Sequence, residues 1–229
     1  MRYYPVNLKI AGRPCLVIGG GRVAERKVKG LLACGARVTV VSPELTPRLA
    51  ALHRENRIAW HDRSYRPGDL AGAFLAIAAT DDEPTQEAVQ QEAEQDNILL
   101  NIADVPHRCN FILPSILSRG DLTIAVSTGG KSPALAKQIR EQLEEQFGPE
   151  YALYLDLLGK LRAIILEQEW PTTANKPLFE SLLHPDMPLW LRTGEWLKIE
   201  AHLQAVLPEA IGRTCLNRLK LQFQSAGSA

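Results

Sequence analysis

The stretch that most constrains the fold is a short apolar run followed at once by three glycines and an amphipathic segment. Residues 15–18 are apolar throughout, which is typical of a β-strand buried on both faces. Three glycines end the run, and apolar residues then recur at helical spacing from Val23 to Leu32. The order of strand, glycine turn and helix is typical of the start of a dinucleotide-binding α/β domain.

The glycines match the pattern G-x-G-x-x-A. Gly19 allows the tight turn, Gly21 lets a pyrophosphate approach the backbone, and Ala24 lets the helix pack close to the strand. Arg22 and Val23 stand at the helix N-terminus, whose unpaired N–H groups attract phosphate. We therefore predict that these five residues bind a dinucleotide cofactor. The alternative interpretation is a purely structural glycine turn in another α/β protein.

The pattern of strand and helix repeats through the first half of the chain. Further apolar runs at 37–41, 58–60, 74–79 and 98–102 predict strands, and segments 47–55 and 84–95 predict helices between them. This alternation predicts an α/β fold with a Rossmann-type, doubly wound parallel sheet over residues 1–113.

Ligands of such sheets bind outside the carboxyl ends of the strands. The residues at these ends predicted to contact the cofactor are Ser42, Pro43, Glu44, Thr80, Asp81 and Asn101. The second strand lacks the usual acidic residue directly at its end, although the Ser42 hydroxyl could bond the adenosine ribose. Because no arginine directly follows Val41, the sequence favours NAD over NADP.

Asp104 follows the fifth strand and would bring a carboxylate to the mouth of the cofactor crevice. Alternatively, it caps a turn before Val105 and Pro106, as aspartate often does. The nearby His107 is either an acid–base group that contacts substrate or a histidine of a surface loop. The sequence leaves both alternatives open.

A second glycine loop follows the strand predicted at 122–126 and opens a helix capped by Ser132. Its end resembles a P-loop, but the first P-loop glycine would fall at Ala125, inside the strand, which argues against nucleotide triphosphate binding. The loop is either a glycine turn into a capped helix or a site for anions such as carboxylates. The predicted anion-binding residues are Thr128, Gly129, Gly130, Lys131 and Ser132.

After residue 113 the predicted pattern changes to a hairpin of strands 111–117 and 122–126, and then to helices. We predict an α+β dimerisation region over 114–149 and a helical C-terminal region over 150–229. The segment 151–167 is apolar over most of its helical surface, which suggests burial on more than one side, including against a second subunit. The expected assembly is a homodimer.

Composition excludes several classes of function. Lys plus Arg and Asp plus Glu balance at 26 each, so no net field favours nucleic acid or an anionic membrane. No apolar run approaches the roughly 20 residues of a membrane-spanning helix. The four cysteines are widely separated without C-x-x-C, which argues against a zinc site or redox pair and fits a cytoplasmic setting. No resident metal is expected.

Four segments together resemble the precorrin-2 dehydrogenase family, which includes the N-terminal module of siroheme synthase. They are Val17–Lys27, Ala76–Asp82, Asn101–Asp104 and Ser127–Ala136, in this order, within a resemblance covering about residues 1 to 165. The resemblance implies NAD-dependent oxidation of precorrin-2 to sirohydrochlorin, and in some members insertion of ferrous iron, as a substrate, to give siroheme. It also implies a Rossmann domain, a central dimerisation region and C-terminal helices.

The family's catalytic aspartate falls on Asp104, and Thr128 matches a serine that is phosphorylated in some relatives. The resemblance implies a tetrapyrrole substrate, for which Asn101, His107 and the loop 128–132 are the predicted contacts. The alternative function is a non-catalytic NAD-binding redox sensor with a helical dimerisation arm. The segment Asn101–Asp104 argues against it, because a sensor does not need that carboxylate.

Overall fold

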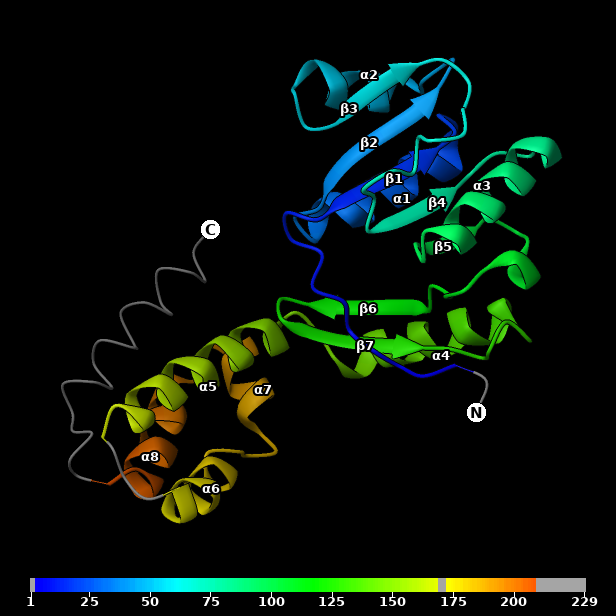
Figure 1. Ribbon diagram of the computed structural model, residues 1–229. Helices are drawn as coiled ribbons and strands as arrows, with labels where there is room; N and C mark the ends of the chain where they lie inside the picture. Colours follow the sequence, from blue (N-terminus) through cyan, green and yellow to red (C-terminus); the bar gives the residue numbers. More distant parts are fainter. Residues whose placement is uncertain (1–2, 169–171, 209–229) are drawn as a thin grey trace. The chain divides into compact units, whose positions relative to one another are not determined.

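The first half of the chain forms a five-stranded parallel sheet in the order β3-β2-β1-β4-β5 (Figure 1). The computed structural model describes residues 3–168 and 172–208, so Cys215 lies outside the described residues. The strands are β1 (Pro14–Ile18), β2 (Arg37–Ser42), β3 (Ala59–Asp62), β4 (Leu75–Ala78) and β5 (Leu99–Ile102). The chain adds strands first on one side of β1 and then on the other, which confirms the predicted doubly wound sheet and makes β1 and β4 its switch point.

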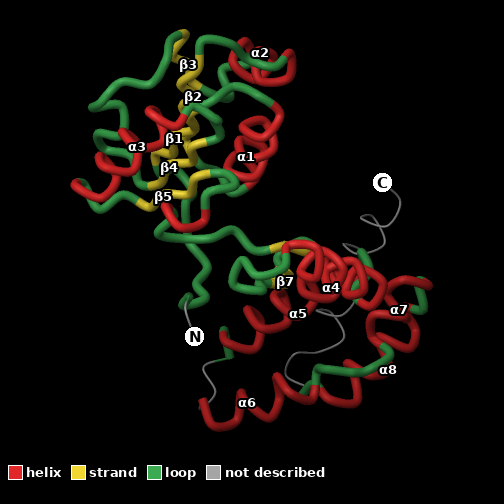
Figure 2. Tube along the Cα trace, turned by 90° about the vertical axis from the view of Figure 1, so that its right-hand side faces the viewer, coloured by secondary structure: helices red, strands yellow, loops and turns green. Residues whose placement is uncertain are grey.

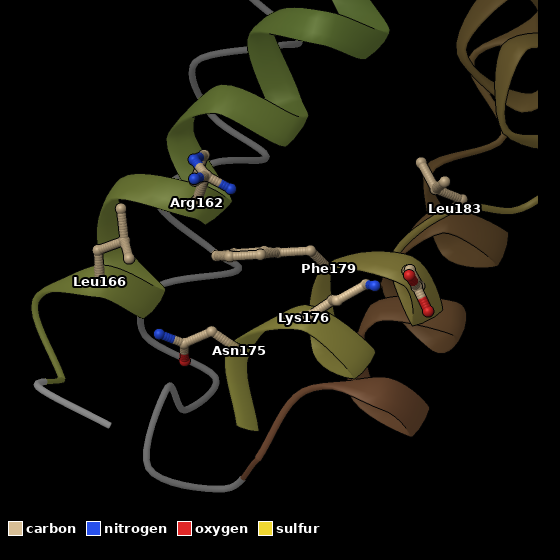
Figure 3. A pocket seen from close by; sticks show the side chains of 7 residues that line it. Arg162, Leu166, Asn175, Lys176, Phe179 and Leu183 are labelled. Carbon is tan, nitrogen blue, oxygen red and sulfur yellow. The ribbon is translucent and has the colours of Figure 1, made fainter. Parts of the chain in front are cut away.

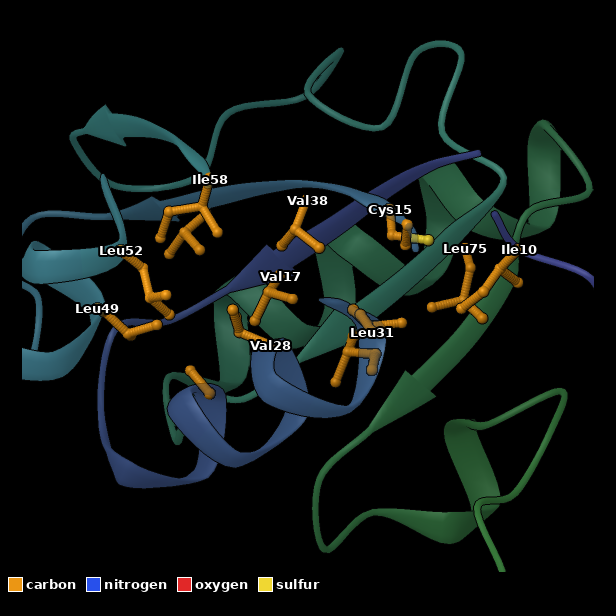
Figure 4. Packing of buried hydrophobic residues seen from close by; sticks show 14 residues of the cluster. Ile10, Cys15, Val17, Val28, Leu31, Val38, Leu49, Leu52, Ile58 and Leu75 are labelled. Carbon is orange, nitrogen blue, oxygen red and sulfur yellow. The ribbon is translucent and has the colours of Figure 1, made fainter. Parts of the chain in front are cut away.

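Helices cover both faces of this sheet (Figure 2). On one face lie α1 (Arg22–Ala33) and α2 (Pro47–Arg54), and on the other lies α3 (Glu83–Gln95). Successive strand residues point to opposite faces, so Val17 packs in the cluster with Val28 of α1 (Figure 4). Ile18 packs in the other cluster, with Val89 of α3. The apolar central strands β1 and β4 are buried on both sides, as expected of a parallel sheet.

Helix starts agree with their capping signals. Thr46 caps α2 by accepting a hydrogen bond from the Leu49 N–H at 3.3 Å. Of the two aspartates before α3, Asp82 is the cap, since its carboxylate accepts from the Thr85 N–H at 2.9 Å. A short 3-10 turn, η1 (Pro106–Arg108), follows β5.

Backbone contacts divide the chain into two units, one comprising residues 1–113 and 129–131 and the other the remaining residues from Pro114. The second unit begins with an antiparallel hairpin of β6 (Ser115–Arg119) and β7 (Leu122–Val126). The first hairpin strand was predicted from residue 111 but begins only after Pro114, which has no N–H to donate. Next comes α4 (Pro133–Gln146), whose predicted cap Ser132 is confirmed by a 3.2 Å bond from the Leu135 N–H.

Four further helices share a second apolar core, namely α5 (Glu150–Leu166), α6 (Thr172–Ser181), α7 (Met187–Thr193) and α8 (Trp196–Val206). Leu157 and Leu161 of α5 are fully buried in one cluster with Met187 of α7 and Ile199 of α8. Neighbours in the same chain thus cover much of the apolar surface of α5 that suggested a second subunit. Pro177 lies inside α6.

An ion pair secures the connection between β3 and β4. Both terminal nitrogens of Arg63 lie 2.7 Å from the carboxylate of Asp69, which also accepts from the Arg66 N–H at 2.9 Å. The hydrogen bond from Arg63 holds the pKa of the Asp69 carboxyl below its usual value, although partial burial acts in the opposite direction.

We predict that Asp69→Asn lowers the free energy of unfolding by about 1–2 kcal/mol at pH 7. A lowered carboxyl pKa contributes stability above the unfolded-state pKa, and this contribution is lost as the pH falls through the folded-state pKa. The difference between wild type and variant in urea unfolding should therefore shrink between pH 5 and pH 2. Asp81→Asn, at an exposed carboxylate, serves as the control. A difference that stays constant with pH would contradict the assignment.

Candidate functional site

Three loops meet at the carboxyl edge of the sheet around Gly19. This glycine has a φ of 107°, and a Cβ built on it would lie 2.3 Å from the carbonyl oxygen of Ala79, after β4. The Gly19 N–H donates to the Val41 carbonyl at 2.9 Å, and the Ala79 N–H donates to the Ile18 carbonyl at 2.7 Å. The turn after β1 is therefore tied to the ends of both neighbouring strands, and only glycine fits there.

Gly20 is equally constrained, although the G-x-G-x-x-A pattern gives this position no role. A Cβ on Gly20 would lie 1.8 Å from the carbonyl oxygen of Glu44, in the loop after β2. The Thr46 N–H donates to the Gly20 carbonyl at 2.9 Å, and the Thr46 hydroxyl donates to the Glu25 carboxylate at 2.7 Å. The sequence could have indicated this role, because Gly20 is the middle residue of three consecutive glycines.

Gly21, in contrast, faces open space. No atom lies within 4 Å of a Cβ built on it, and as the N-cap residue of α1 it provides no side chain to bond the first N–H groups of the helix. Ala24 is fully buried in the cluster that contains β1, while Arg22 is exposed and Val23 half-buried. The first N–H groups of α1 are therefore uncapped and next to open space, where they could bind the pyrophosphate of a dinucleotide.

The loop after β2 presents Pro43 and Glu44 to solvent. Ser42 is only 7% exposed, and its hydroxyl accepts from the Glu44 N–H at 3.4 Å. Its carbonyl accepts from the Trp60 indole N–H at 2.8 Å. Ser42 thus shapes the loop, and its contact with a ribose stays a prediction.

The loop after β4 is held from α3. The Thr80 hydroxyl accepts from the Asp82 N–H at 3.2 Å, and the Thr80 carbonyl accepts from the Gln86 side chain at 2.8 Å. Asp81 is exposed beside them. Thr80 and Asp81 lie at the carboxyl edge of the sheet, as predicted. Their contacts with a cofactor remain predictions.

Asp104 lies exposed in the turn after β5, with a φ of 62°. Aspartate is among the few residues that tolerate this left-handed conformation. Among residues 3–168 and 172–208 its carboxylate accepts no hydrogen bond, so the alternative of a turn cap finds no support there. Because the strands are parallel, this carboxylate and the start of α1 share one edge of the sheet.

Side chains rather than a further strand hold the turn that carries Asp104. The Cys109 thiol accepts from the Ile102 N–H at 3.1 Å and lies 3.3 Å from the Val105 carbonyl, to which it donates. The Asn110 side chain accepts from the Leu100 N–H at 2.7 Å. Burial raises the pKa of the Cys109 thiol, which keeps it protonated as a donor. The wide separation of the four cysteines in the sequence argued against a zinc site or redox pair but did not indicate this role of Cys109.

Asn101 also belongs to this bracing. Its side chain is 9% exposed, and its amide nitrogen donates to the Phe111 carbonyl at 3.1 Å. The same nitrogen lies 3.6 Å from the Cys109 sulfur. These contacts occupy the amide nitrogen, and a contact of Asn101 with cofactor or substrate stays a prediction.

Lys27, on α1, is the cation whose charge interacts with that of Asp104. Burial lowers the pKa of the Lys27 ammonium, as does the nearby Arg26, whereas the Asp104 carboxylate and Cys109 act in the opposite direction. The sequence alone does not single out Lys27. On an amphipathic helix, a lysine that lies near a distant carboxylate has the same sequence pattern as a solvated lysine.

His107 lies exposed in η1 and lines a small cavity of about 90 Å³ together with Gln90 and Glu94 of α3. Its neighbour Arg108 bonds Glu83 and Glu87 of α3 at 3.3 Å each. His107 thus borders α3 on the side of β5, and its contact with substrate remains a prediction.

The second glycine loop connects β7 to α4. The Thr128 hydroxyl donates to the Ser132 carbonyl at 3.0 Å and accepts from the Ser132 N–H at 3.1 Å. Gly129 and Gly130 have φ values of 62° and 83°, and Lys131 is exposed. The predicted glycine turn into a capped helix is confirmed, and anion binding by the loop stays a prediction.

Within residues 3–168 and 172–208, no group of three or more His, Cys, Asp and Glu side chains is arranged to hold a metal ion. In the same part of the chain, no helix is both long and apolar enough to cross a membrane.

Comparison with known proteins identifies the family. The sequence profile of an NAD(P)-binding family matches residues 6–115, and that of the central region of a sirohaem biosynthesis protein matches residues 119–146. A siroheme synthase of Aeromonas salmonicida is 40% identical over 186 residues, and that of Methylobacillus flagellatus is 42% identical over 179 residues. These alignments cover 81% and 78% of this chain, but the chain spans only 40% and 38% of the length of these relatives.

A solved structure resembles nearly the whole chain. SirC, a precorrin-2 dehydrogenase, superposes with a TM-score of 0.77 and 29% sequence identity, over 89% of this chain and 98% of SirC. The matched profiles, the relatives and this structure agree with the glycine turn and the parallel sheet described above. The chain belongs to the precorrin-2 dehydrogenase family, which also supplies a module of siroheme synthases.

Proposed function

We propose that this protein oxidises precorrin-2 to sirohydrochlorin with NAD. The observation that carries the proposal is the exposed Asp104 carboxylate on the same sheet edge as the uncapped N-terminus of α1. The likeness to SirC, which extends over 98% of that dehydrogenase, supports the choice of reaction.

The chemistry follows from the residues at this edge. The oxidation removes a hydride and a proton from the tetrapyrrole, and bound NAD supplies the hydride acceptor. Gly21 and the first N–H groups of α1 hold the pyrophosphate, which fixes the cofactor along the edge. Asp104 accepts the proton as a general base. Lys27 places a cation near that carboxylate.

The choice of NAD rests on the loop after β2. Glu44 is exposed there, and its carboxylate would repel the 2′-phosphate of NADP. Anion binding by residues 128–132 would serve the carboxylates of the tetrapyrrole, with Lys131 exposed for that purpose.

Iron insertion is a second candidate activity, favoured by the siroheme synthases among the relatives. Chelation displaces pyrrole protons, which the same Asp104 carboxylate could accept. Ferrous iron would then be a substrate of the site.

We also propose a cytoplasmic location. Cys15, Cys34 and Cys109 are free thiols, and Cys34 is exposed. An exposed free thiol suits a reducing compartment.

The direct test of the function is incubation of the protein with precorrin-2 and NAD, with and without ferrous iron. The proposal expects NADH to form in step with the sirohydrochlorin spectrum. A redox sensor would bind NAD without any turnover, and that result would overturn the proposal.

Cofactor binding gives the first prediction about the site. Gly21→Asp places a negative side chain in the open space above α1, so NAD affinity should fall by at least about 100-fold. The control is Gly30→Asp, because Gly30 on α1 also has open surroundings. Gly68→Asp is less suitable, because Gly68 has a positive φ that strains any side chain. Titration of protein fluorescence with NAD and NADP measures both affinities. Tighter binding of NADP than of NAD, or unchanged affinity in Gly21→Asp, would contradict the assignment.

Proton transfer gives the second prediction. Asp104→Asn keeps the side-chain shape but removes the base, so the rate of NADH formation should fall by about 10²–10⁴-fold. The matched control is Asp62→Asn, which alters an exposed carboxylate at the end of β3. NAD affinity should be unchanged in both variants. A rate within twofold of wild type for Asp104→Asn would remove its catalytic role.

We further propose that the protein is a homodimer formed through the hairpin β6–β7 and α4. A two-stranded sheet is marginal by itself and exposes its edges. Ile116 of β6 and Leu135 of α4, which are adjoining elements, are 50% and 48% exposed. A second copy of the chain packed on the hairpin with C2 symmetry would cover Ile116.

The dimer proposal predicts that Ile116→Asp yields a monomer at micromolar concentration. Leu197→Asp, at an even more exposed leucine on α8, should leave the dimer intact. Light scattering coupled to size exclusion measures the mass of both variants. A wild-type protein with the mass of one chain would contradict the proposal.

A further inference from the structure

A cavity of about 470 Å³ lies between α5 and α6 in the second unit (Figure 3). Its volume is within the range of pockets for small organic molecules and is many times the roughly 30 Å³ that one water occupies. A complete tetrapyrrole with its carboxylate side chains is larger than this space. The cavity therefore suits a different and smaller molecule than the proposed substrate.

Two cations at the cavity are available to an anion. The Arg162 guanidinium lies 4.5 Å above the Phe179 ring, and Lys176 lines the same space. Across residues 3–168 and 172–208 neither cation forms an ion pair, although Glu180 also lines the cavity. Lys160, on the same helix as Arg162, is in contrast paired with Asp156 at 2.8 Å.

The remaining wall is apolar. The Phe179 ring lies between the side chains of Arg162 and Asn175 in Figure 3. Leu166 and Leu183 also line the cavity and are about half exposed, at 49% and 56%. An apolar body placed here would remove these side chains from water.

We propose that this cavity binds a small amphipathic organic anion. Its carboxylate or sulfonate pairs with Arg162 and Lys176, and its ring or chain packs on Phe179 and the two leucines. The site lies entirely in the second unit and is independent of the proposed dehydrogenase reaction.

Anilinonaphthalene sulfonate is a suitable probe, since it combines a sulfonate and an aromatic body. Fluorescence titration of the full chain should reveal one site per chain. The double variant Arg162→Met with Lys176→Met should weaken binding by about tenfold or more. Lys137→Met, which removes an exposed cation on α4, should leave the affinity unchanged.

A melting temperature of the double variant equal to that of wild type shows that the variant is folded. Equal affinity in wild type and the double variant, or equal weakening in Lys137→Met, would overturn the proposal. NAD affinity should be the same in every variant.

Discussion

The architecture of the first unit depends on the close approach of backbone at Gly19 and Gly20. Carbonyl oxygens of Ala79 and Glu44 occupy the space where side chains of these two residues would otherwise stand. The resulting contacts join the loops that follow β1, β2 and β4, and the bond from the Ala103 N–H to the Ala78 carbonyl at 2.8 Å extends the series to β5. The carboxyl edge of the sheet is therefore one continuous structure. The start of α1 and the turn that carries Asp104 are therefore fixed to the same framework.

The outer end of this framework is held in another way. β5 is an edge strand, and side chains of Cys109 and Asn110 bond its backbone where a sixth strand would otherwise pair. Such pairing by side chains satisfies the edge without extending the sheet. It also leaves the turn between Ile102 and Cys109 short and braced, so that an exposed carboxylate can be held in a left-handed conformation at a defined place. Flexible residues would position a proton acceptor less well.

The sequence predicted those features that follow from local pattern. Continuous apolar runs identified the five strands, helical spacing identified the first three helices, and capping chemistry identified Ser132 before α4. The roles of Gly20, Lys27 and Cys109 could not be predicted, because each depends on a neighbour distant in sequence or on a turn whose geometry is visible only in three dimensions. The apolar surface of α5 was ambiguous for the same reason. Its partners α7 and α8 are short, and pattern alone does not distinguish them from a second subunit.

The central claim is that the cofactor lies along this edge with its reactive end beside Asp104. A crystal structure of the protein with NAD tests it most directly. The account predicts the pyrophosphate over Gly21 at the N-terminus of α1 and the nicotinamide ring in contact with the turn after β5. A cofactor bound away from Gly21, or a nicotinamide directed toward β3 instead of Asp104, would contradict the account.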